Sequence, residues 1–373
     1  MNRLGRFLSF QICGESHGHG VGAILDGIPS GLPVSVERVQ EKLDRRRPGQ
    51  NRHTTKRNEA DAIQIKSGVF HDKTTGAPIL LWIDNKDTKS KHYDNIRRIP
   101  RPGHADWTGH VKFDGFQDPR GGGHFSGRLT APLVAAGALA QEVLAHHQIS
   151  VSAHLNQVGA LSGPVNTVDV GTMAERVKTS SIQTAHADLE ESFVQHIDEA
   201  RTDHGNSIGG AIEFRAEGLP VGLGEPWAMS VESHLSQYLF SIPAIKGVSF
   251  GAGFDAVKMR GSEHNDAYRM EDGVVRVQSN HAGGVLGGIT TGAPLWGSVA
   301  VKPTSSIFHA QDSVDIVSQE NTTLEIKGRH DPIIAVRAVP VVEAAIALGL
   351  ADLLLCFFSA HGTKSPWLGD EKP

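Results

Sequence analysis

A five-residue segment occurs twice in this chain, and each copy precedes a run of apolar residues. Thr-Thr-Gly-Ala-Pro fills residues 74–78 and again residues 290–294. Residues 79–83 and 298–302, which lie shortly after the two copies, have the composition of β-strands. Two explanations fit the repeat: coincidence over five residues, or an ancient duplication that left two similar halves around one shared core. The second explanation restricts the chain to folds with two matching parts.

Four segments have the composition or periodicity of helices, so the fold mixes helices with strands. In residues 189–200 and 231–239 apolar side chains recur at helical spacing, and Gly205 follows the first segment as a stop signal. Residues 130–147 are rich in alanine and glycine, which predicts a helix packed closely on another element. The fourth segment is the most apolar stretch of the chain, residues 341–358.

That apolar stretch is predicted to be a buried helix and not a membrane span. It contains two carboxylates, Glu343 and Asp352. A membrane-spanning helix needs about 20 consecutive apolar residues with few charges. We therefore expect no membrane association.

No change of composition and no linker divides the chain into independent domains. At 373 residues it is long enough to bury a large core. We predict one domain over residues 1–363 and a poorly ordered tail at residues 364–373.

The overall charge and the cysteine content favour a cytoplasmic protein that acts on small molecules. The formal net charge is -5 and the pI is about 6.5, whereas domains that bind nucleic acids are usually basic. Cys13 and Cys356 are the only cysteines, so a disulfide framework is excluded and a reducing compartment is expected. Residues 1–10 lack the pattern of a signal peptide.

Residues 45–57 form the most basic segment, with six cations in thirteen residues and no acidic residue. Pro48 and Gly49 are a turn pair within it. One interpretation is a folded pocket for a small polyanion, because the planar guanidinium group binds phosphate or carboxylate with two hydrogen bonds. The other interpretation is a solvated basic loop. This segment alone does not separate the two.

Further glycine-, histidine- and arginine-rich islands lie at residues 14–20, 101–106, 118–130, 302–306 and 327–332. Their histidines His17 and His104 are candidate acids or bases, since histidine titrates near neutral pH. The alternative for each is an ordinary structural histidine. Neighbouring histidines, such as His17 with His19, do not have the spacing of a zinc site, so no metal is predicted.

Two of the islands are candidate anion sites. The glycines of residues 121–123 precede a predicted helix, and loop amides at a helix N-terminus bind anions. The segment lacks the signatures of a phosphate-binding loop and of a dinucleotide fold. Lys302 with Thr304, Ser305 and Ser306 could bind a second phosphate, or form a polar turn after a strand.

Eight motifs in sequence order resemble those of the chorismate synthase family over about residues 5–354. They are Gly-Glu-Ser-His-Gly, Arg-Arg-Arg-Pro-Gly, Ser-Gly-Val-Phe, Arg-Pro-Gly-His-Ala-Asp, Arg-Gly-Gly-Gly, Ser-Asn-His-Ala-Gly-Gly, Lys-Pro-Thr-Ser-Ser and Gly-Arg-His-Asp-Pro. One such motif is weak, but eight in order are specific to the family.

The resemblance implies a lyase that eliminates phosphate from 5-enolpyruvylshikimate 3-phosphate to form chorismate. The reaction is a 1,4-anti elimination that requires reduced FMN without net redox change. The implied fold is of mixed α/β (α+β) type, a single-domain sandwich with helices between two mainly antiparallel sheets. A homotetramer is also implied. NADPH enters only if the protein reduces its own flavin; otherwise a separate flavin reductase is a partner.

The resemblance also implies roles for individual residues. His17 would protonate the departing phosphate, His104 would serve the reduced flavin, and Asp331 would take up the flavin proton. The implied substrate-binding residues are Arg46, Arg52, Arg101, Ser126, Arg128 and Arg329. The implied flavin-binding residues are His124, Phe125, Ser126, Pro243, Ala244, Gly287, Lys302, Pro303, Thr304, Ser305, Ser306 and Arg329.

Two departures from the family pattern fall on flavin-contact positions. Residues 124–129 read His-Phe-Ser-Gly-Arg-Leu where many members have Arg-Ser-Ser-Ala-Arg-Glu. Pro243 replaces an asparagine before Ala244. The retained serine and arginine favour altered flavin packing over lost function. The alternatives are a non-catalytic paralogue that binds a polyanion, such as RNA, or a flavin, and a metal-dependent phosphatase.

Overall fold

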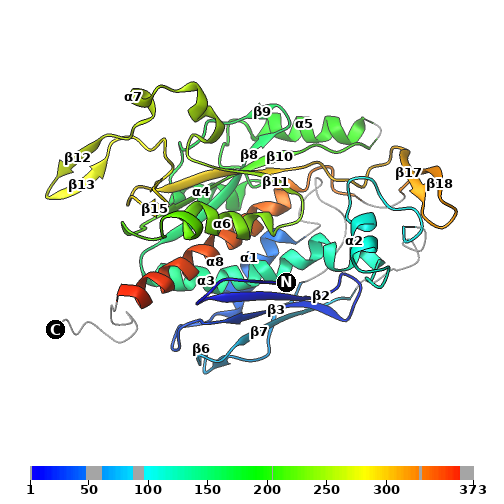
Figure 1. Ribbon diagram of the computed structural model, residues 1–373, viewed down its shortest axis with the longest axis horizontal. Coiled ribbons are helices and arrows are strands. Elements are labelled where there is room, and N and C mark those ends of the chain that lie inside the picture. The colour runs from blue at the N-terminus through cyan, green and yellow to red at the C-terminus, as the bar shows by residue number, and fades with distance from the viewer. Residues whose placement is uncertain (1, 48–60, 87–95, 204, 327–329, 362–373) are drawn as a thin grey trace.

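The computed structural model describes residues 2–47, 61–86, 96–203, 205–326 and 330–361. Two five-stranded sheets enclose a layer of helices, so the predicted sandwich is confirmed. In Figure 1 one sheet lies below the helices and the other above them. The predicted tail at residues 364–373 lies outside the described residues.

The first sheet has the strand order β1-β2-β3-β7-β4, and all its neighbouring strands are antiparallel. Its strands are β1 (Arg3–Leu4), β2 (Ser9–Gly14), β3 (Gly20–Asp26), β4 (Gln64–Ile65) and β7 (Ile79–Asp84). In β7 every second side chain, from Ile79 to Ile83, is buried against the helices. The strand predicted at residues 79–83 is confirmed.

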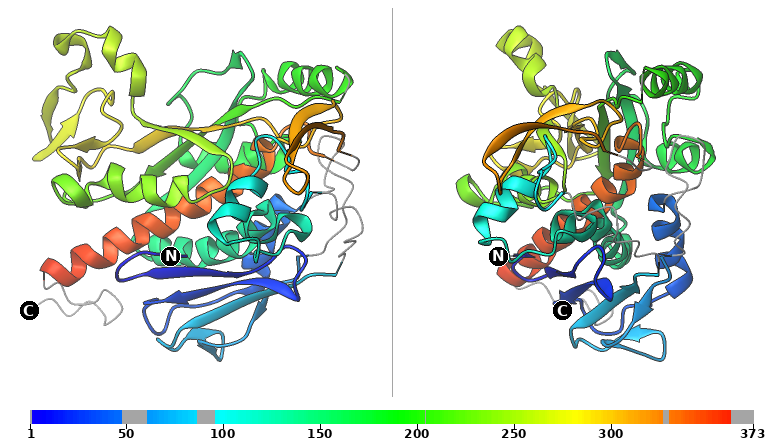
Figure 2. Two further views of the ribbon diagram at one scale, coloured as in Figure 1. Left: turned by 45° about the vertical axis from the view of Figure 1, so that its right-hand side comes forward. Right: turned by 90° about the vertical axis from the view of Figure 1, so that its right-hand side faces the viewer.

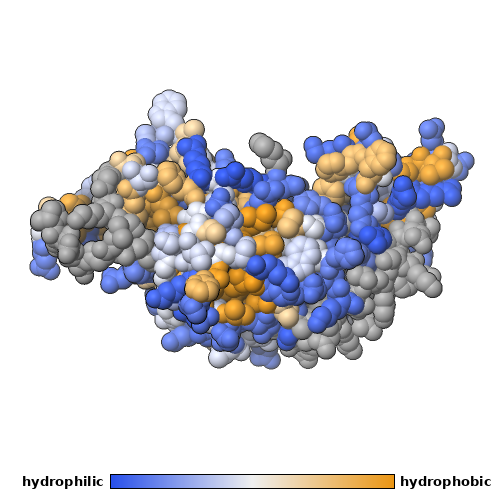
Figure 3. Space-filling view, turned by 90° about the horizontal axis from the view of Figure 1, so that it is seen from below, coloured by the Kyte–Doolittle hydropathy of each residue, from blue (hydrophilic) through white to orange (hydrophobic). Residues whose placement is uncertain are grey.

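The outer face of this sheet is partly apolar. Seen from below, an apolar area lies among hydrophilic residues (Figure 3). The Trp82 ring lies against the backbone of β3, where a Cβ on Gly20 or Gly22 would approach ring atoms to within 2.7 Å. Ile24 on the same strand remains 39% exposed. The two glycines are therefore required by the close approach of the tryptophan.

The second sheet has the order β11-β16-β10-β8-β9 and is also antiparallel. Its strands are β8 (Ser150–Val158), β9 (Leu161–Ser162), β10 (Gly210–Glu217), β11 (Ile245–Phe250) and β16 (Leu295–Val301). The strand predicted at residues 298–302 begins earlier than expected, because Leu295 and Trp296 already pair with β10.

The helical layer contains α1 (Val36–Arg46), α3 (Thr130–His146), α6 (Val231–Phe240) and α8 (Ala335–His361). A Cβ on Gly137 of α3 would lie 2.3 Å from the Cβ of Ala344 on α8, so only glycine permits this close packing. The Ala- and Gly-rich segment therefore packs as predicted. Helix α1 was not predicted; it contains the first residues of the basic segment.

Helix α8 begins before the predicted residue 341 and includes Pro340. A proline inside a helix frees the carbonyl four residues earlier, here that of Val336. The amide Nε2 of Gln183 donates to this carbonyl at 2.8 Å. By length and hydropathy α8 could cross a membrane, but 78% of its most apolar window is buried within the molecule. It is a core helix, as predicted.

The remaining elements are short or peripheral. Helix α5 (Glu190–Thr202) matches the predicted segment and ends before Gly205. The other helices are α2 (Asp106–Lys112), α4 (Val170–Thr179) and α7 (Gly261–His264). Hairpins are formed by β5 (Val69–Phe70) with β6 (Lys73–Thr74), β12 (Tyr268–Glu271) with β13 (Val274–Val277), β14 (Val285–Leu286) with β15 (Ile289–Thr290), and β17 (Gln311–Asp315) with β18 (Glu320–Leu324).

The elements of the two halves match in order. Strands β2, β3, β7 and β4 correspond to β8, β10, β16 and β11, which are neighbours in the same sequence within their sheet. Helices α1 and α3 correspond to α6 and α8, and the hairpin β5–β6 corresponds to β14–β15.

The repeated segment makes the same bonds in each half. The Thr74 hydroxyl accepts from Leu32 N at 2.9 Å and donates to Pro29 O at 2.6 Å. The Thr290 hydroxyl accepts from Leu223 N at 2.9 Å and donates to Pro220 O at 2.6 Å. This correspondence favours duplication over coincidence.

Candidate active site

Two long segments at equivalent positions of the halves meet at one end of the molecule. Residues 85–129 connect β7 to α3, and residues 302–334 connect β16 to α8. The Ser313 hydroxyl donates to Pro100 O at 2.6 Å, and Ile316 N donates to Arg98 O at 3.1 Å. Figure 2 shows the second segment, in orange, against the first, in cyan. The predicted islands lie where these segments meet.

His17 lies against the glycine loop of residues 121–123. It is 5% exposed and belongs to the turn between β2 and β3. Ser16 N donates to Gly123 O at 3.2 Å, which ties the turn to the loop. Gly121 has a φ of 63°, and a Cβ there would lie 2.6 Å from Nε2 of His17. Glycine is thus required both for this backbone conformation and for the approach of the imidazole.

His104 approaches the next glycine of the same loop. A Cβ on Gly122 would lie 3.4 Å from Nε2 of His104. Nδ1 of His104 lies 2.7 Å from Oδ1 of Asp106, which makes Nδ1 the donor, and Nε2 lies near the glycine and 3.3 Å from Nη2 of Arg101. The two predicted catalytic histidines therefore lie against Gly121 and Gly122.

Asp106 also orients Arg101. Nε of Arg101 donates to Oδ2 of Asp106 at 2.7 Å. Burial alone would raise the pKa of the Asp106 carboxyl, but the hydrogen bonds from Arg101 and His104 and their charge hold it well below its ordinary range. Asp106 is therefore ionised at neutral pH and fixes both side chains.

A second charged cluster joins α1 to the start of α3. Arg46 is 4% exposed; its Nη1 donates to Oδ2 of Asp61 at 3.1 Å and its Nη2 to Gly127 O at 2.7 Å. Nη1 of Arg128 donates to the other oxygen of Asp61, and its Nε donates to Oδ1 of Asn85 at 3.1 Å. Two predicted substrate-binding arginines thus share one buried carboxylate.

The first two residues of the basic segment, Arg45 and Arg46, belong to helix α1 and not to a solvated loop. Arg45 donates from Nη1 to Glu343 at 3.0 Å, and Lys42 donates to the same carboxylate at 2.8 Å. These contacts tie α1 to α8. The remaining cations of the segment beyond residue 47, including Arg52, lie outside the described residues.

Asp331 is joined to this cluster through Arg337, at the start of α8. Nη1 of Arg337 donates to Oδ2 of Asp331 at 2.8 Å, and its Nε donates to Arg46 O at 3.2 Å. The carbonyl of Asp331 accepts from the Thr304 hydroxyl at 2.8 Å. Asp331 therefore lies between the basic helix end and the Lys-Pro-Thr-Ser-Ser segment. Arg329 lies outside the described residues.

Lys302 connects that segment to the His104 loop. Its Nζ donates to Gly103 O, and its backbone N donates to Ala244 O at 3.0 Å. Burial, and to a smaller extent the charge of Lys246, lowers the pKa of Lys302. Nη1 of Arg101 donates to the Ser306 hydroxyl at 3.5 Å.

Only some of the predicted flavin-binding residues lie close to this cluster. Ala244 has a φ of 72°, unusual for alanine, and meets Lys302, whereas Pro243 is exposed beside it. Gly287 lies elsewhere: its neighbour Gly288 accepts from Val231 N at 2.9 Å, at the opposite end of α6 from Ala244. Within one chain Gly287 is therefore not part of this cluster.

The residues that depart from the family pattern face two directions. Nδ1 of His124 lies 3.4 Å from Gly14 O. The Phe125 ring packs against Gly109 and lies 6.2 Å from the Phe113 ring. The Ser126 hydroxyl accepts from Arg128 N at 3.2 Å, so it caps the next helical turn.

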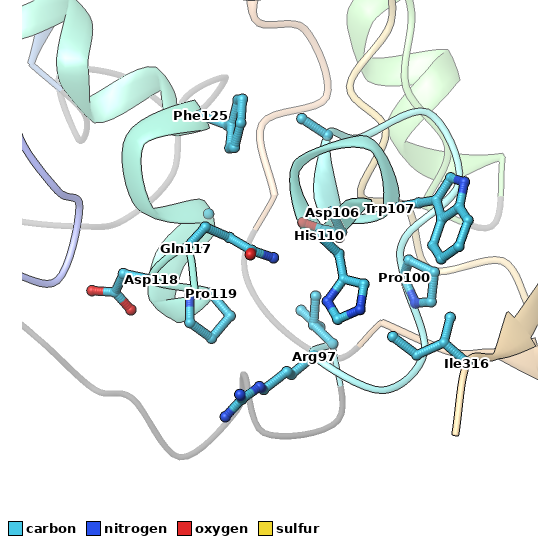
Figure 4. A pocket seen from close by; sticks show the side chains of 13 residues that line it. Arg97, Pro100, Asp106, Trp107, His110, Gln117, Asp118, Pro119, Phe125 and Ile316 are labelled. Carbon is cyan, nitrogen blue, oxygen red and sulfur yellow. The ribbon is translucent and has the colours of Figure 1, made fainter. Parts of the chain in front are cut away.

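Phe125 also lines a small pocket beside Asp106 and Gly122. Figure 4 shows Trp107 and His110 around this pocket with Phe125. Aromatic walls and ionised side chains are the usual lining of a small-molecule site. The pocket brings Phe125, a predicted flavin residue, together with Asp106, which accepts from His104.

Sequence reasoning missed the residues that connect the cluster, namely Asp61, Asp106 and Arg337. Asp106 lies within the Arg-Pro-Gly-His-Ala-Asp motif, and Arg337 is an isolated charge in an apolar segment. Either feature could have identified its residue from the sequence. Asp61 carries no such signal. Among the described residues, no group of histidine, cysteine, aspartate and glutamate could hold a metal ion.

Comparisons with known proteins agree with the motifs. The sequence profile described as chorismate synthase matches residues 8–355. The chorismate synthase of Methanosarcina mazei is 44% identical over 354 residues, covering 95% of this chain and 96% of that protein. That of Korarchaeum cryptofilum is 45% identical over 354 residues, covering 94% and 96%. A crystal structure of chorismate synthase has a TM-score of 0.74 at 29% identity, covering 95% of this chain and 93% of the other. The chain therefore belongs to the chorismate synthase family of lyases.

Proposed function

We propose that this chain converts 5-enolpyruvylshikimate 3-phosphate to chorismate by 1,4-anti elimination of phosphate, with reduced FMN as a cofactor. The observation that carries the proposal is the position of His17 and His104 against neighbouring glycines of one loop, within a cluster of buried cations. Two proton-transfer groups at one loop suit an elimination in which a leaving group and a proton depart.

The charge of the cluster suits the substrate. The substrate carries two carboxylates and a phosphate, and removing such charge from water is costly without matched cations. Arg46, Arg101 and Arg128 are all largely buried. Together with Lys302 and Arg337 they outnumber the carboxylates Asp61, Asp106 and Asp331 among the described residues of the cluster. The remaining positive charge attracts an anion.

His17 is the proposed acid. Its buried position beside the glycine loop limits access of water, so a proton on its imidazole can pass directly to a phosphate oxygen as the carbon–oxygen bond breaks. Asp118 lies within electrostatic reach of His17. Arg101 and Arg128 would hold the substrate so that its phosphate faces this histidine.

His104 and Asp331 are proposed to transfer the proton that leaves the substrate ring. Asp106 accepts from Nδ1 of His104, so Nε2 is the atom that can bind or release a proton at the glycine loop. Asp331 is held by Arg337 and is the proposed final acceptor. Each carboxylate thus has a partner that keeps its position before substrate binds.

The donor set also fits FMN. Lys302 and the hydroxyls of Thr304, Ser305 and Ser306 are phosphate-binding groups on one short segment. Phe125 lines the neighbouring pocket. When bound, reduced FMN would supply electron density for the departure of phosphate and an acceptor for the ring hydrogen. Pro243, Ala244, His124 and Pro303 complete the proposed flavin site, together with Arg329.

Assembly and supply of reduced flavin are further parts of the proposal. We propose a cytoplasmic homotetramer, in which Gly287 could reach the flavin site of a neighbouring copy. Exposed apolar side chains such as Ile24 support burial by a second copy. The flavin is reduced either by this protein with NADPH or by a separate flavin reductase.

An anaerobic assay of phosphate release tests the function. The expected result is phosphate and chorismate from the shikimate phosphate with reduced FMN, and no product with oxidised FMN or without flavin. Equal release under all three conditions would refute the proposal. Flavin or substrate binding without any product would instead favour a non-catalytic paralogue.

A further inference from the structure

Asp61 is the shared partner of two arginines that approach it from different parts of the chain. Its side chain is 0% exposed. One carboxylate oxygen accepts from Nη1 of Arg46 at 3.1 Å, and the other accepts from Nη1 of Arg128. Arg46 ends α1, whereas Arg128 precedes α3. One carboxylate therefore sets the relative position of two guanidinium groups.

The backbone at Asp61 is itself held in place. Gln40 on α1 donates from Nε2 to Asp61 O at 3.4 Å and accepts from Ile63 N at 3.1 Å. The φ of Asp61 is 44°, in the left-handed region where aspartate and asparagine are better tolerated than most residues. The carboxylate is thus presented from a fixed backbone, and asparagine could replace it without changing the backbone preference.

Other contacts also hold the two arginines. Arg46 donates from Nε to the Thr130 hydroxyl at 2.9 Å and from Nη2 to Gly127 O at 2.7 Å, which ties it to the segment that carries Arg128. Arg128 donates from Nε to Oδ1 of Asn85 at 3.1 Å. These acceptors are neutral. The carboxylate of Asp61, which contacts both guanidinium groups, offsets the repulsion between their positive charges.

We propose that Asp61 is a positioning residue that holds Arg46 and Arg128 as one preformed site for the anionic groups of the substrate. This inference rests on the proposed function, since it takes the two arginines as substrate ligands. Arginine side chains lose much rotational freedom on binding, and preorganisation removes that cost from the binding step. Asp61 does not touch the reacting atoms and acts through the arginines alone.

The direct test is Asp61→Asn, which keeps the size of the side chain and removes its charge. The KM for the shikimate phosphate, and its Kd measured by titration of the flavin-free protein, should each rise about tenfold, equivalent to ~1.4 kcal/mol. The kcat at saturating substrate should stay within about twofold, because substrate still reaches the same catalytic groups. Asp61→Glu keeps the charge but displaces it by one methylene, and should give an intermediate KM.

Asp72→Asn is the matched control. Asp72 lies in the same half, also has a positive φ, 55°, and is exposed at the turn between β5 and β6. The Asp72→Asn substitution removes the same charge at an exposed turn, outside the arginine cluster. It should leave KM, kcat and the melting temperature unchanged. A rise of KM in this control equal to that in Asp61→Asn would mean that net charge explains both, and would overturn the proposal.

Two other results would overturn it. An unchanged KM and Kd in Asp61→Asn would show that the arginines do not need the carboxylate. A lower melting temperature and lower active fraction with unchanged KM would assign Asp61 to folding only. If Asp61→Asn does not fold, the KM of Asp61→Glu tests the proposal instead, and a wild-type KM in that variant would overturn it. Absence of turnover and binding in the wild-type protein would instead refute the proposed function, which keeps the two failures distinct.

Discussion

The two halves of this protein have the same framework but differ in what is attached to it. Both contain an antiparallel sheet, a hairpin ended by the repeated threonine, and a long central helix. Helix α1 ends in Arg45 and Arg46, whereas its counterpart α6 has no basic residue in its last turn. The turn between β2 and β3 carries His17, and the corresponding connection between β8 and β10 carries α4 and α5.

This difference shows that the framework and the chemistry are separable in this fold. Residues that the halves share make backbone hydrogen bonds and pack the core. Residues that they do not share form the charged cluster. Function thus depends on segments added to the framework. The predictions below test this separation, from the largest expected effect to the smallest.

Removing a proposed proton-transfer histidine should have the largest effect. His17→Ala and His104→Ala should each lower kcat by about 10²- to 10⁴-fold, the usual range for a general acid or base. Substrate binding should survive. The control is His196→Ala on α5, a half-buried histidine of the second half. Steady-state kinetics with reduced FMN measure all three, and wild-type kcat in both site variants would contradict the assigned roles.

Arg46→Ala should weaken substrate binding by about 1.5–3 kcal/mol, because a charge-assisted contact is lost. Arg46→Lys should rescue only partly, since lysine cannot form a two-pronged contact. Ser241→Ala at the corresponding end of α6 is the control, as its hydroxyl only donates to Tyr238 O at 2.6 Å. Substrate titrations compare the variants. Equal affinity in all would remove the functional difference between the two helix ends.

Glu343 should make the attachment of α1 to α8 sensitive to acid. Burial would raise the pKa of its carboxyl, but the charges of Arg45 and Lys42 lower it to about 2, from 4.5. Because the folded pKa is depressed, this stabilisation is present above pH 4.5 and is lost as the pH falls toward 2.

Glu343→Gln should therefore lower the free energy of unfolding at neutral pH, on the order of 2 kcal/mol, and should match wild type at the acid end of that range. Urea titrations at several pH values measure the difference. A gap between wild type and variant that is constant with pH would show that the ionisation of Glu343 is not responsible.

The smallest effect is expected at the repeated threonines, and it should be equal in the two halves. Thr74→Val and Thr290→Val each remove a hydroxyl that makes two hydrogen bonds. Each should lower the free energy of unfolding by about 1–2 kcal/mol and leave the KM unchanged. Thermal melts and kinetics check both statements. A large change in kcat for either variant would show that framework and chemistry are coupled.

Local patterns predicted most of the framework. The strand at residues 79–83 and the helices at residues 130–147, 189–200 and 231–239 were confirmed, because alternation and helical spacing report which face of an element is buried. The start of α8 was missed because Pro340 argues against a helix there. The amide of Gln183, far away in sequence, makes the proline acceptable by bonding the carbonyl that it frees.

The repeat left duplication and coincidence both open, and the matching order of elements in the structure favoured duplication. The sequence by itself determined the family and the islands that carry the chemistry. These depend on residue identity and on short-range spacing. Only the tertiary structure decided how the islands are joined: Asp61 to Arg46 and Arg128, Arg337 to Asp331, and Lys302 to the loop of His104. It also separated Gly287 from the other predicted flavin residues. The physical reason is that charge pairing acts through space, and contacts such as that of Arg337 with Arg46, 291 residues apart, exist only once the topology has brought the segments together.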